Sequence, residues 1–233
     1  MDFIISFCEN ILIYGIPVVL AITLHEAAHG FVALKCGDDT AYLMGRVSFN
    51  PLKHIDLFGT LIIPILLVLS HAPFIFGYAK PVPVNFQRLR HPRRDTIFVA
   101  LAGPLTNIFL AFLSACLFYL LPLFPLQIDQ GLQNMLSTSV LINCVLAIFN
   151  MIPILPLDGG RIFGELLPTS LRQDFMKTER FGMLIIILLI TFPFLTELIL
   201  GFKVPLLSWI LFPFLNGLLK VISMISGIPL SVF

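Results

Sequence analysis

The chain has 233 residues, of which 58% are hydrophobic and 12% are charged, and its mean hydropathy is +0.99. Soluble domains are about 45–50% apolar and about 25% charged. A domain of this length has too little interior to bury the surplus apolar surface, so that surface must face lipid and a water-soluble globule is excluded. The net charge of +1 argues against nucleic acid as a partner, because phosphate binding requires a basic field that this chain lacks.

Long uncharged stretches divide the chain into five or six candidate membrane segments, since about 20 apolar residues cross a hydrocarbon layer of about 30 Å as a helix. In chain order they are 11–35, 57–79, 96–128, 132–151, 181–200 and 204–220. The second is short and interrupted by two prolines and a glycine, and the third is expected to be helical only to about Leu121, because Pro122 follows. We therefore expect an all-α polytopic membrane protein with a single integral-membrane domain over residues 1–233, ending in a helical hairpin at about 181–226.

Two stretches between these segments indicate extended backbone. In residues 45–51 the apolar side chains of Val47 and Phe49 alternate with polar ones, a period of two that is typical of a strand. In residues 77–85 two prolines prevent a helix. The sequence therefore predicts a small membrane-associated β-hairpin or re-entrant region beside the helices.

The sequence His25-Glu-Ala-Ala-His29 is an HExxH motif within the first apolar segment. On a helix this spacing places two imidazoles one turn apart on one face, where both reach one Zn²⁺, and Glu26 takes the position of a general base. The alternative is a chance match, in which histidine and glutamate simply lie on the exposed surface of an amphipathic helix. Within a lipid-spanning helix, however, ionisable side chains are costly unless they face a partner or a wet cavity. The motif is therefore interpreted as a catalytic zinc site, with His25 and His29 as ligands.

A third protein ligand is expected, because catalytic zinc usually has three. Asp158 is the best candidate: it follows the fourth apolar segment, where nearby prolines open the backbone and two glycines allow close approach. The alternative is that Asp158 only caps a helix that begins near Arg161. Other acidic residues compete less well, since they lie in polar loops or near the far end of a helix.

A shared zinc ion constrains the topology. If all six segments crossed the membrane, the C-terminal ends of the first and fourth would emerge on opposite faces, and His29 and Asp158 would lie most of a bilayer apart. The conflict disappears if 57–79 is re-entrant and returns to the side from which it came. All basic residues except Lys203 then fall on the active-site face, and the positive-inside rule makes that face cytoplasmic.

Five short motifs follow one another between residues 10 and 165. They are HEAAH at 25–29, GRVSFNP at 45–51 with HID at 54–56, GYAKPVP at 77–83, AGPLTN at 102–107 and NMIPILPLDGG at 150–160. Together they resemble the site-2 protease family of intramembrane zinc metalloproteases, peptidase family M50, in the short form without a PDZ-like or CBS-like domain. The resemblance implies a three-helix catalytic core over about 10–165 and a membrane-associated β-hairpin near 45–51. It also implies the following site residues: metal ligands His25, His29 and Asp158, the base Glu26, and Asn107 and Asn150 near the substrate.

From the residues and the resemblance we expect hydrolysis of peptide bonds within or near the transmembrane helices of membrane proteins. The expected cofactor is one Zn²⁺, and the expected partners are a transmembrane-helix substrate and the lipid bilayer; the oligomeric state is left open. A compact chain without an organelle-targeting sequence is compatible with a bacterial inner membrane, with the active site toward the cytoplasm. The alternative is a metal-ion transporter with a His/Asp/Glu site, which should show repeat-related halves and ionisable residues along a path. A scaffold with a structural zinc would not require Glu26.

Overall fold

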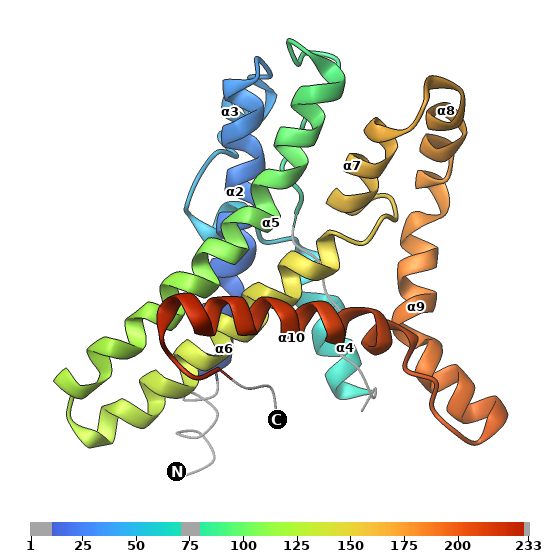
Figure 1. Cartoon of the computed structure of the whole chain (residues 1–233). Helices are drawn as coiled ribbons and strands as arrows, with labels where there is room; N and C mark the ends of the chain where they lie inside the picture. The colour runs from blue at the N-terminus through green and yellow to red at the C-terminus, as the bar shows by residue number, and fades with distance from the viewer. Residues whose placement is uncertain (1–10, 71–79, 231–233) are drawn as a thin grey trace.

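All regular structure in the computed structural model, which describes residues 11–70 and 80–230, is helical (Figure 1). The α-helices are α2 (Ile16–Lys35), α3 (Thr40–Leu43), α4 (Ile63–Leu69), α5 (Pro92–Leu117), α6 (Leu126–Asn150), α7 (Asp158–Leu166), α8 (Thr169–Lys177), α9 (Glu179–Leu200) and α10 (Leu206–Ser226). Short π or 3-10 turns are η1 (Ile11–Gly15), η2 (Pro51–Lys53), η3 (Leu57–Ile62) and η4 (Phe118–Leu123).

Five helices are long and apolar enough to cross a membrane. They comprise Leu12–Lys35, Pro92–Leu123, Gln130–Asn150, Glu179–Leu200 and Leu206–Ser226. Their apolar faces remain largely exposed in the isolated chain, which is the pattern expected where lipid replaces water. The protein is therefore an integral membrane protein, and the predicted all-α polytopic architecture is confirmed.

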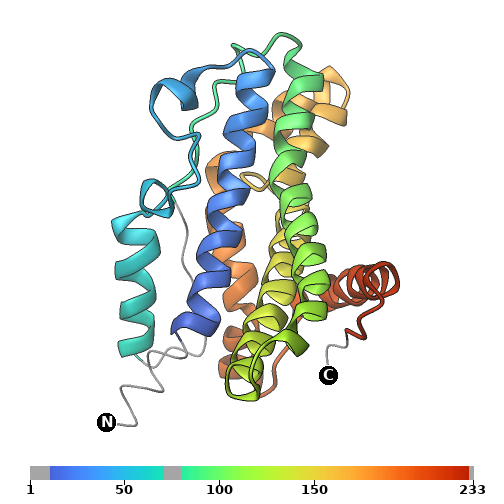
Figure 2. The same cartoon turned by 90° about the vertical axis from the view of Figure 1, so that its left-hand side faces the viewer.

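Helices α2, α5 and α6 form the centre of the molecule, and Figure 2 shows α2 and α5 running side by side. Small residues are buried where these helices meet, among them Ala21, Ala33, Ala111, Ala115 and Cys144. In lipid, helices associate through close packing rather than through a hydrophobic driving force, and small side chains let their backbones approach. The packing of α2, α5 and α6 is therefore close enough to bring side chains of different helices within hydrogen-bonding distance.

Helix α7 returns the chain to this centre after α6. The loop between them folds against the start of α7, and a side chain at Gly159 or Gly160 would collide with the backbone of residues 151–155. Glycine is thus required by close approach, as the sequence predicts. Because α7 also packs on α5, its first residue, Asp158, lies next to α2 and α5.

The C-terminal helices are attached differently. Helix α9 ends at Gly201, whose φ of +78° is left-handed. Helix α10 then lies across α5 and α6, as both views show (Figures 1 and 2). Its contact is mainly apolar: Leu215, Leu219 and Ile222 are buried against α5 and α6, and at its end the Tyr119 hydroxyl donates to Ser226 O at 2.8 Å.

The predicted β-hairpin at 45–51 is not found, and no strand occurs within the described ranges. The chain there makes turn-type bonds instead: Gly45 has a φ of +63°, and the Arg46 N–H donates to Ala41 O. The Asn50 side chain then accepts from Leu52 N–H and starts η2. The backbone N–H groups at the two ends of this stretch bond to α3 and to the Ser48 side chain rather than to a neighbouring strand, so the alternation in side-chain polarity is not accompanied by a strand.

The interrupted segment 57–79 is described only to residue 70. Asp56 caps it by accepting from the backbone N–H groups of Phe58 and Gly59, and η3 and α4 follow. This helix is not among the candidate spans, and Figure 2 shows it at the edge of the molecule, on the side of α2 away from α5. Residues 71–79, and with them the predicted return of the chain, lie outside the described residues. The following residues 80–85 have no helical or strand assignment.

Candidate metal centre

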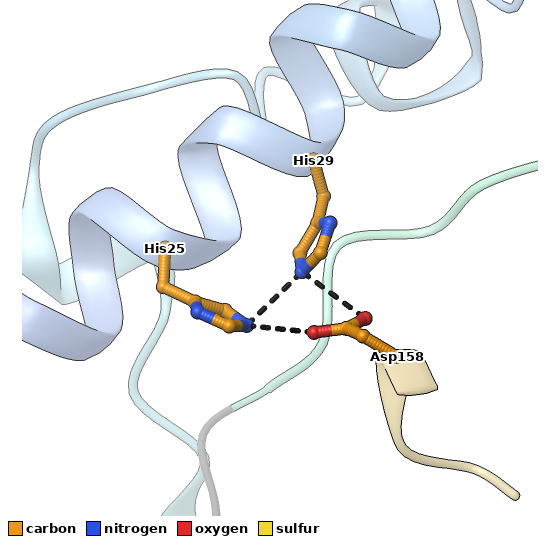
Figure 3. Close-up of side chains that lie close together, drawn as sticks. All are labelled: His25, His29 and Asp158. Atoms are coloured by element: carbon orange, nitrogen blue, oxygen red, sulfur yellow. Dashed lines mark hydrogen bonds and ion pairs between the residues drawn. The ribbon is translucent and has the colours of Figure 1, made fainter. Parts of the chain in front are cut away.

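The two histidines of α2 and the first residue of α7 converge on one point (Figure 3). The Nε2 atoms of His25 and His29 are 3.0 Å apart. Asp158 Oδ2 lies 3.3 Å from His25 Nε2, and Asp158 Oδ1 lies 3.4 Å from His29 Nε2. All three candidate ligand atoms lie within 4.8 Å of one another. The HExxH spacing and α7 packing thus combine two imidazoles and a carboxylate, the donor set of a catalytic zinc site.

The hydrogen bonds on the far side of each ring define what faces this point. His29 Nδ1 lies 2.7 Å from Val99 O, which can only accept, so Nδ1 carries the proton and Nε2 presents a lone pair. His25 Nδ1 lies 2.5 Å from Asn107 Oδ1, which assigns the same tautomer. Asp158 Oδ2 is buried and makes no hydrogen bond. Several acceptors directed at one point are mutually repulsive without a cation, so the residues fit a bound divalent metal.

Asp158 begins α7 without capping it, because the N-terminus of this helix has no side-chain cap hydrogen bond. The structure therefore does not favour the capping alternative. Metal ligation requires the carboxylate of Asp158 in its ionised form.

Gly103 on α5 provides the space for this centre. A Cβ at this position would lie 2.5 Å from His25 Cε1 and Nε2 and would also collide with His29 Nε2. Pro104 follows and has no N–H, so the Ala100 carbonyl in the turn before loses its helical donor. In the sequence this position is marked only by the Gly103-Pro104 pair in the middle of an apolar stretch, which does not by itself indicate a role beside the histidines.

Glu26 faces the same side of α2 and is held by backbone. Its Oε2 accepts from the Val82 N–H at 2.7 Å. The carbonyl groups preceding Val82 are in turn held by Arg46, whose Nη2 donates to Lys80 O at 2.7 Å and to Pro81 O at 3.4 Å. Arg46 is only 7% exposed. The arginine of the loop thus positions the extended segment that orients the predicted base, a connection that the sequence did not indicate.

A cavity with a volume of about 620 Å³ opens onto the centre. His25, Glu26, His29 and Asp158 line its polar side. The volume is in the range of ordinary ligand sites. The arrangement gives a reactant simultaneous access to the candidate metal ligands and to a carboxylate.

The two predicted asparagines lie in different places. Asn150, at the end of α6, lines the cavity, and its Nδ2 donates to Leu146 O at 3.0 Å. Asn107 is 0% exposed and lies behind His25. Its Nδ2 donates to Asn143 Oδ1 at 2.8 Å and to Ala21 O at 3.3 Å. The structure thus brings Asn150 to the cavity and engages both ends of the Asn107 amide within the protein.

A helical membrane fold with two buried histidines, a partly buried aspartate at bonding distance and an adjacent carboxylate defines the class of membrane-embedded metallohydrolases. Comparisons with known proteins agree with this protein class. The peptidase family M50 matches residues 13–127 and 125–192. The chain is 36% identical over 206 residues to YwhC of Bacillus subtilis (strain 168), named as a zinc metalloprotease, covering 87% of this chain and 85% of that protein.

A second relative is Rip2 of Mycolicibacterium smegmatis, also named as a zinc metalloprotease, with 26% identity over 179 residues, 77% of this chain and 66% of that protein. No solved structure matches the chain. The chain belongs to peptidase family M50, the site-2 protease family. Its enzyme class is metalloprotease, as the motifs indicate.

Proposed function

We propose that this protein is an intramembrane zinc metalloprotease that hydrolyses peptide bonds within or near the transmembrane helices of membrane proteins. His25, His29 and Asp158 are proposed to hold one Zn²⁺, whose chemistry when bound is that of a Lewis acid that polarises the scissile carbonyl. The observation that carries the proposal is the convergence of these three side chains, from two helices, on a cavity that also contains Glu26. The names of both relatives agree with zinc as the metal.

Glu26 is proposed as the general base. It follows the first ligand directly in sequence, so its carboxylate lies beside the centre, and the Val82 N–H holds one of its oxygens. The other oxygen is the group that removes a proton from the attacking water and later returns it to the leaving amine. Orientation by a backbone donor means that the carboxylate does not have to be ordered anew in each turnover.

The substrate must present an exposed backbone. In a helix each scissile carbonyl is already hydrogen-bonded to the N–H four residues on, so a transmembrane substrate has to unwind locally before attack. Pro81, Val82 and Val84 of the segment 80–85 line one wall of the cavity, and Asn150 lines it as well. We assign this segment to backbone pairing with the unwound substrate, and the amide oxygen of Asn150 to accepting a substrate N–H.

We further propose a topology in which the catalytic core spans about 10–165 and the segment 57–79 is re-entrant. In support, the helical part from 57 to 69 is shorter than a span, and α2 and α7 meet at the centre. The C-terminal end of α2, the N-terminal end of α5, and α8 lie together at one end of the molecule (Figure 1). The basic residues of these elements include Lys35, Arg93 and Lys177, and the positive-inside rule assigns this end to the cytoplasm, in a bacterial inner membrane.

A metal-ion transporter is not favoured. A transport path requires ionisable groups across the membrane. In α5, the helix against which the centre is built, charged residues occur only in its first four positions, Arg93, Arg94 and Asp95. The rest of α5, from residue 96 to 117, carries no charged residue, which suits an enclosed reaction site better than a permeation path.

The testing experiment compares two labelled peptides with purified, zinc-loaded protein in lipid vesicles. One peptide carries a cleavable sequence within an apolar helix long enough to span the bilayer; the other carries the same sequence without the flanking apolar residues. Cleavage of the spanning peptide alone, abolished by a zinc chelator and restored by Zn²⁺, is the expected result. Cleavage of the soluble peptide alone would overturn the intramembrane proposal, and zinc flux into vesicles without any cleavage would favour the transporter.

A further inference from the structure

A connected set of buried polar side chains extends from His25 away from the cavity, into the contact between α5 and α6. We propose that Asn143, acting through Asn107, is a positioning residue that holds His25 in the tautomer whose Nε2 binds the metal. The inference rests on the proposed role of His25 as a ligand. Asn143 touches neither the cavity nor the candidate ligands; it is two hydrogen bonds away from the His25 ring.

The distances define a continuous path across three helices. From α2, His25 Nδ1 lies 2.5 Å from Asn107 Oδ1 on α5. Asn107 Nδ2 lies 2.8 Å from Asn143 Oδ1 on α6. Asn143 Nδ2 donates to Ser139 O, one turn earlier in α6, at 2.8 Å. Asn107 is 0% and Asn143 is 2% exposed, so neither amide is solvated by bulk water.

The direction of every bond on this path follows from its last member. The Ser139 backbone carbonyl can only accept, so the NH₂ end of the Asn143 amide must point toward it. The oxygen of Asn143 then faces Asn107 and requires a donor, so Asn107 presents its NH₂ to Asn143 and its oxygen to His25. An oxygen requires a donor in turn, so His25 Nδ1 carries the proton and Nε2 carries the lone pair.

The opposite orientation of the Asn107 side-chain amide would change the tautomer of His25. If the Asn107 amide were flipped, its NH₂ would face His25 Nδ1, which would become an acceptor. The ring proton would then move to Nε2, and the nitrogen facing Asp158 and His29 would have no lone pair for a metal. The carbonyl of Ala21 also accepts from Asn107 Nδ2, but at 3.3 Å, a longer bond than the 2.8 Å bond to Asn143. Asn143 is therefore the principal determinant of the Asn107 orientation.

His29 offers an internal comparison. Its Nδ1 donates directly to the Val99 backbone carbonyl at 2.7 Å, and a backbone carbonyl cannot be flipped. His29 needs no side chain to define its tautomer, whereas His25 needs two. Loss of Asn143 should therefore affect the two rings unequally.

The ordinary alternative is that Asn107 and Asn143 only bind α5 to α6. Hydrogen bonds between membrane helices contribute modestly to stability, and that role predicts a loss of stability with no change at His25. Ser114 on α5 provides the matched control, because its hydroxyl lies 2.7 Å from the Ser139 hydroxyl on α6 and it is 7% exposed. Ser114→Ala removes this buried α5–α6 hydrogen bond. The Ser139 hydroxyl also lies 3.4 Å from Asn143 Nδ2, but the shorter 2.8 Å bond to Ser139 O still fixes the Asn143 amide in the variant.

The test uses the full-length protein in detergent micelles and compares Asn143→Leu, Asn143→Asp and Ser114→Ala. Zinc affinity is measured by competition with a chelator, and the tautomers of His25 and His29 are measured in the metal-free protein by ¹⁵N chemical shifts. For Asn143→Leu we expect about 10- to 100-fold weaker zinc binding, the usual effect of losing an outer-shell partner, and a mixture of tautomers at His25 but not at His29. For Asn143→Asp in its neutral acid form, the O–H donates to Ser139 O and the other carboxyl oxygen still accepts from Asn107, so we expect wild-type affinity and tautomers. We expect the same for Ser114→Ala.

Two outcomes separate this inference from the assignment of the metal site. His25→Ala that retained zinc at wild-type affinity would refute His25 as a ligand. His25→Ala that lost zinc, together with Asn143→Leu that kept wild-type affinity and a single His25 tautomer, would overturn the positioning role alone. If Asn143→Leu does not fold, Asn143→Ala removes the same acceptor without added bulk, and the same two results decide the question.

Discussion

The α2–α5–α6–α7 centre and the C-terminal helices α9 and α10 are both strongly apolar, but they differ in how their side chains are buried and paired. In the centre, polar side chains such as Asn107 and Asn143 are almost completely buried and each has a defined partner. In the C-terminal helices, large apolar side chains are exposed, with Leu198 at 83%, Ile199 at 75% and Trp209 at 62%.

This difference has a physical cause. Burying an amide or a carboxylate is costly unless its partner is in place, so the centre tolerates few alternatives. Lipid-facing side chains only have to be apolar, so many sequences serve equally well in α9 and α10. Substitutions should therefore separate the two regions sharply, from loss of the metal in the centre to a small effect in α10.

The largest effect is expected for Asp158→Ala. It removes the only carboxylate of the candidate ligand set in the described chain, leaving two imidazoles, so zinc binding and peptide cleavage should both be lost. Metal content after dialysis and cleavage of a spanning peptide measure the two effects. Asp174→Ala is the matched control, since that carboxylate is 75% exposed and pairs only with Lys177 on the surface; it should retain both properties.

Glu26→Gln should separate chemistry from metal binding. The substitution keeps the shape of the side chain but removes the base, so the turnover rate should fall by about 10²- to 10⁴-fold while zinc remains bound. Metal analysis and single-turnover cleavage on the same sample give both values. Wild-type hydrolysis by the purified variant would rule out the assigned role of Glu26.

Gly103→Ala should disturb the metal centre by steric overlap, without removing any polar group. The added methyl group occupies space taken by both imidazoles, which their Nδ1 hydrogen bonds hold in place. Overpacking typically costs about 1–3 kcal/mol, and here the cost should appear mainly as weaker zinc binding, with helix content by circular dichroism unchanged. Zinc affinity equal to that of the wild type would show that the rings are free to move aside.

Arg46→Met should act on the base without touching the ligands. The substitution removes the donor to the carbonyl groups of Lys80 and Pro81, so the segment that presents the Val82 N–H to Glu26 loses an anchor. A hydrogen bond to a charged group contributes about 1.5–3 kcal/mol, which corresponds to about a 10- to 100-fold lower kcat. Zinc affinity should be unchanged, and a parallel loss of zinc would contradict this separation.

The smallest effect is expected for Gly217→Ala in α10. A Cβ at this position meets nothing within 4 Å, and alanine is favoured over glycine in a helix by up to about 1 kcal/mol. Activity and zinc content should stay at wild-type levels, with thermal stability equal or slightly higher. A loss of activity comparable to that of Gly103→Ala would show that α10 is coupled to the centre.

Several features of the protein were predictable because they depend on short separations along the chain. The HExxH spacing brings His25 and His29 to one helix face through the 3.6-residue period, and long uncharged stretches predict the spans. The Gly159-Gly160 pair predicts a close approach and the structure shows one. The alternation at 45–51 failed as a strand prediction, because a period of two describes side chains and cannot reveal that backbone groups pair within a loop.

The sequence by itself determined that this is a membrane protein, which residues form its long helices and that Asp158 is the best partner for the two histidines. Only the tertiary structure decided which groups orient that set: the Val99 carbonyl behind His29, the Asn107–Asn143 pair behind His25 and the Val82 N–H on Glu26. The reason is physical. Backbone carbonyl and N–H groups are present at every residue, and buried amides resemble any other helix-packing residue, so their roles depend on which atoms the packing of α2, α5 and α6 brings within about 3 Å.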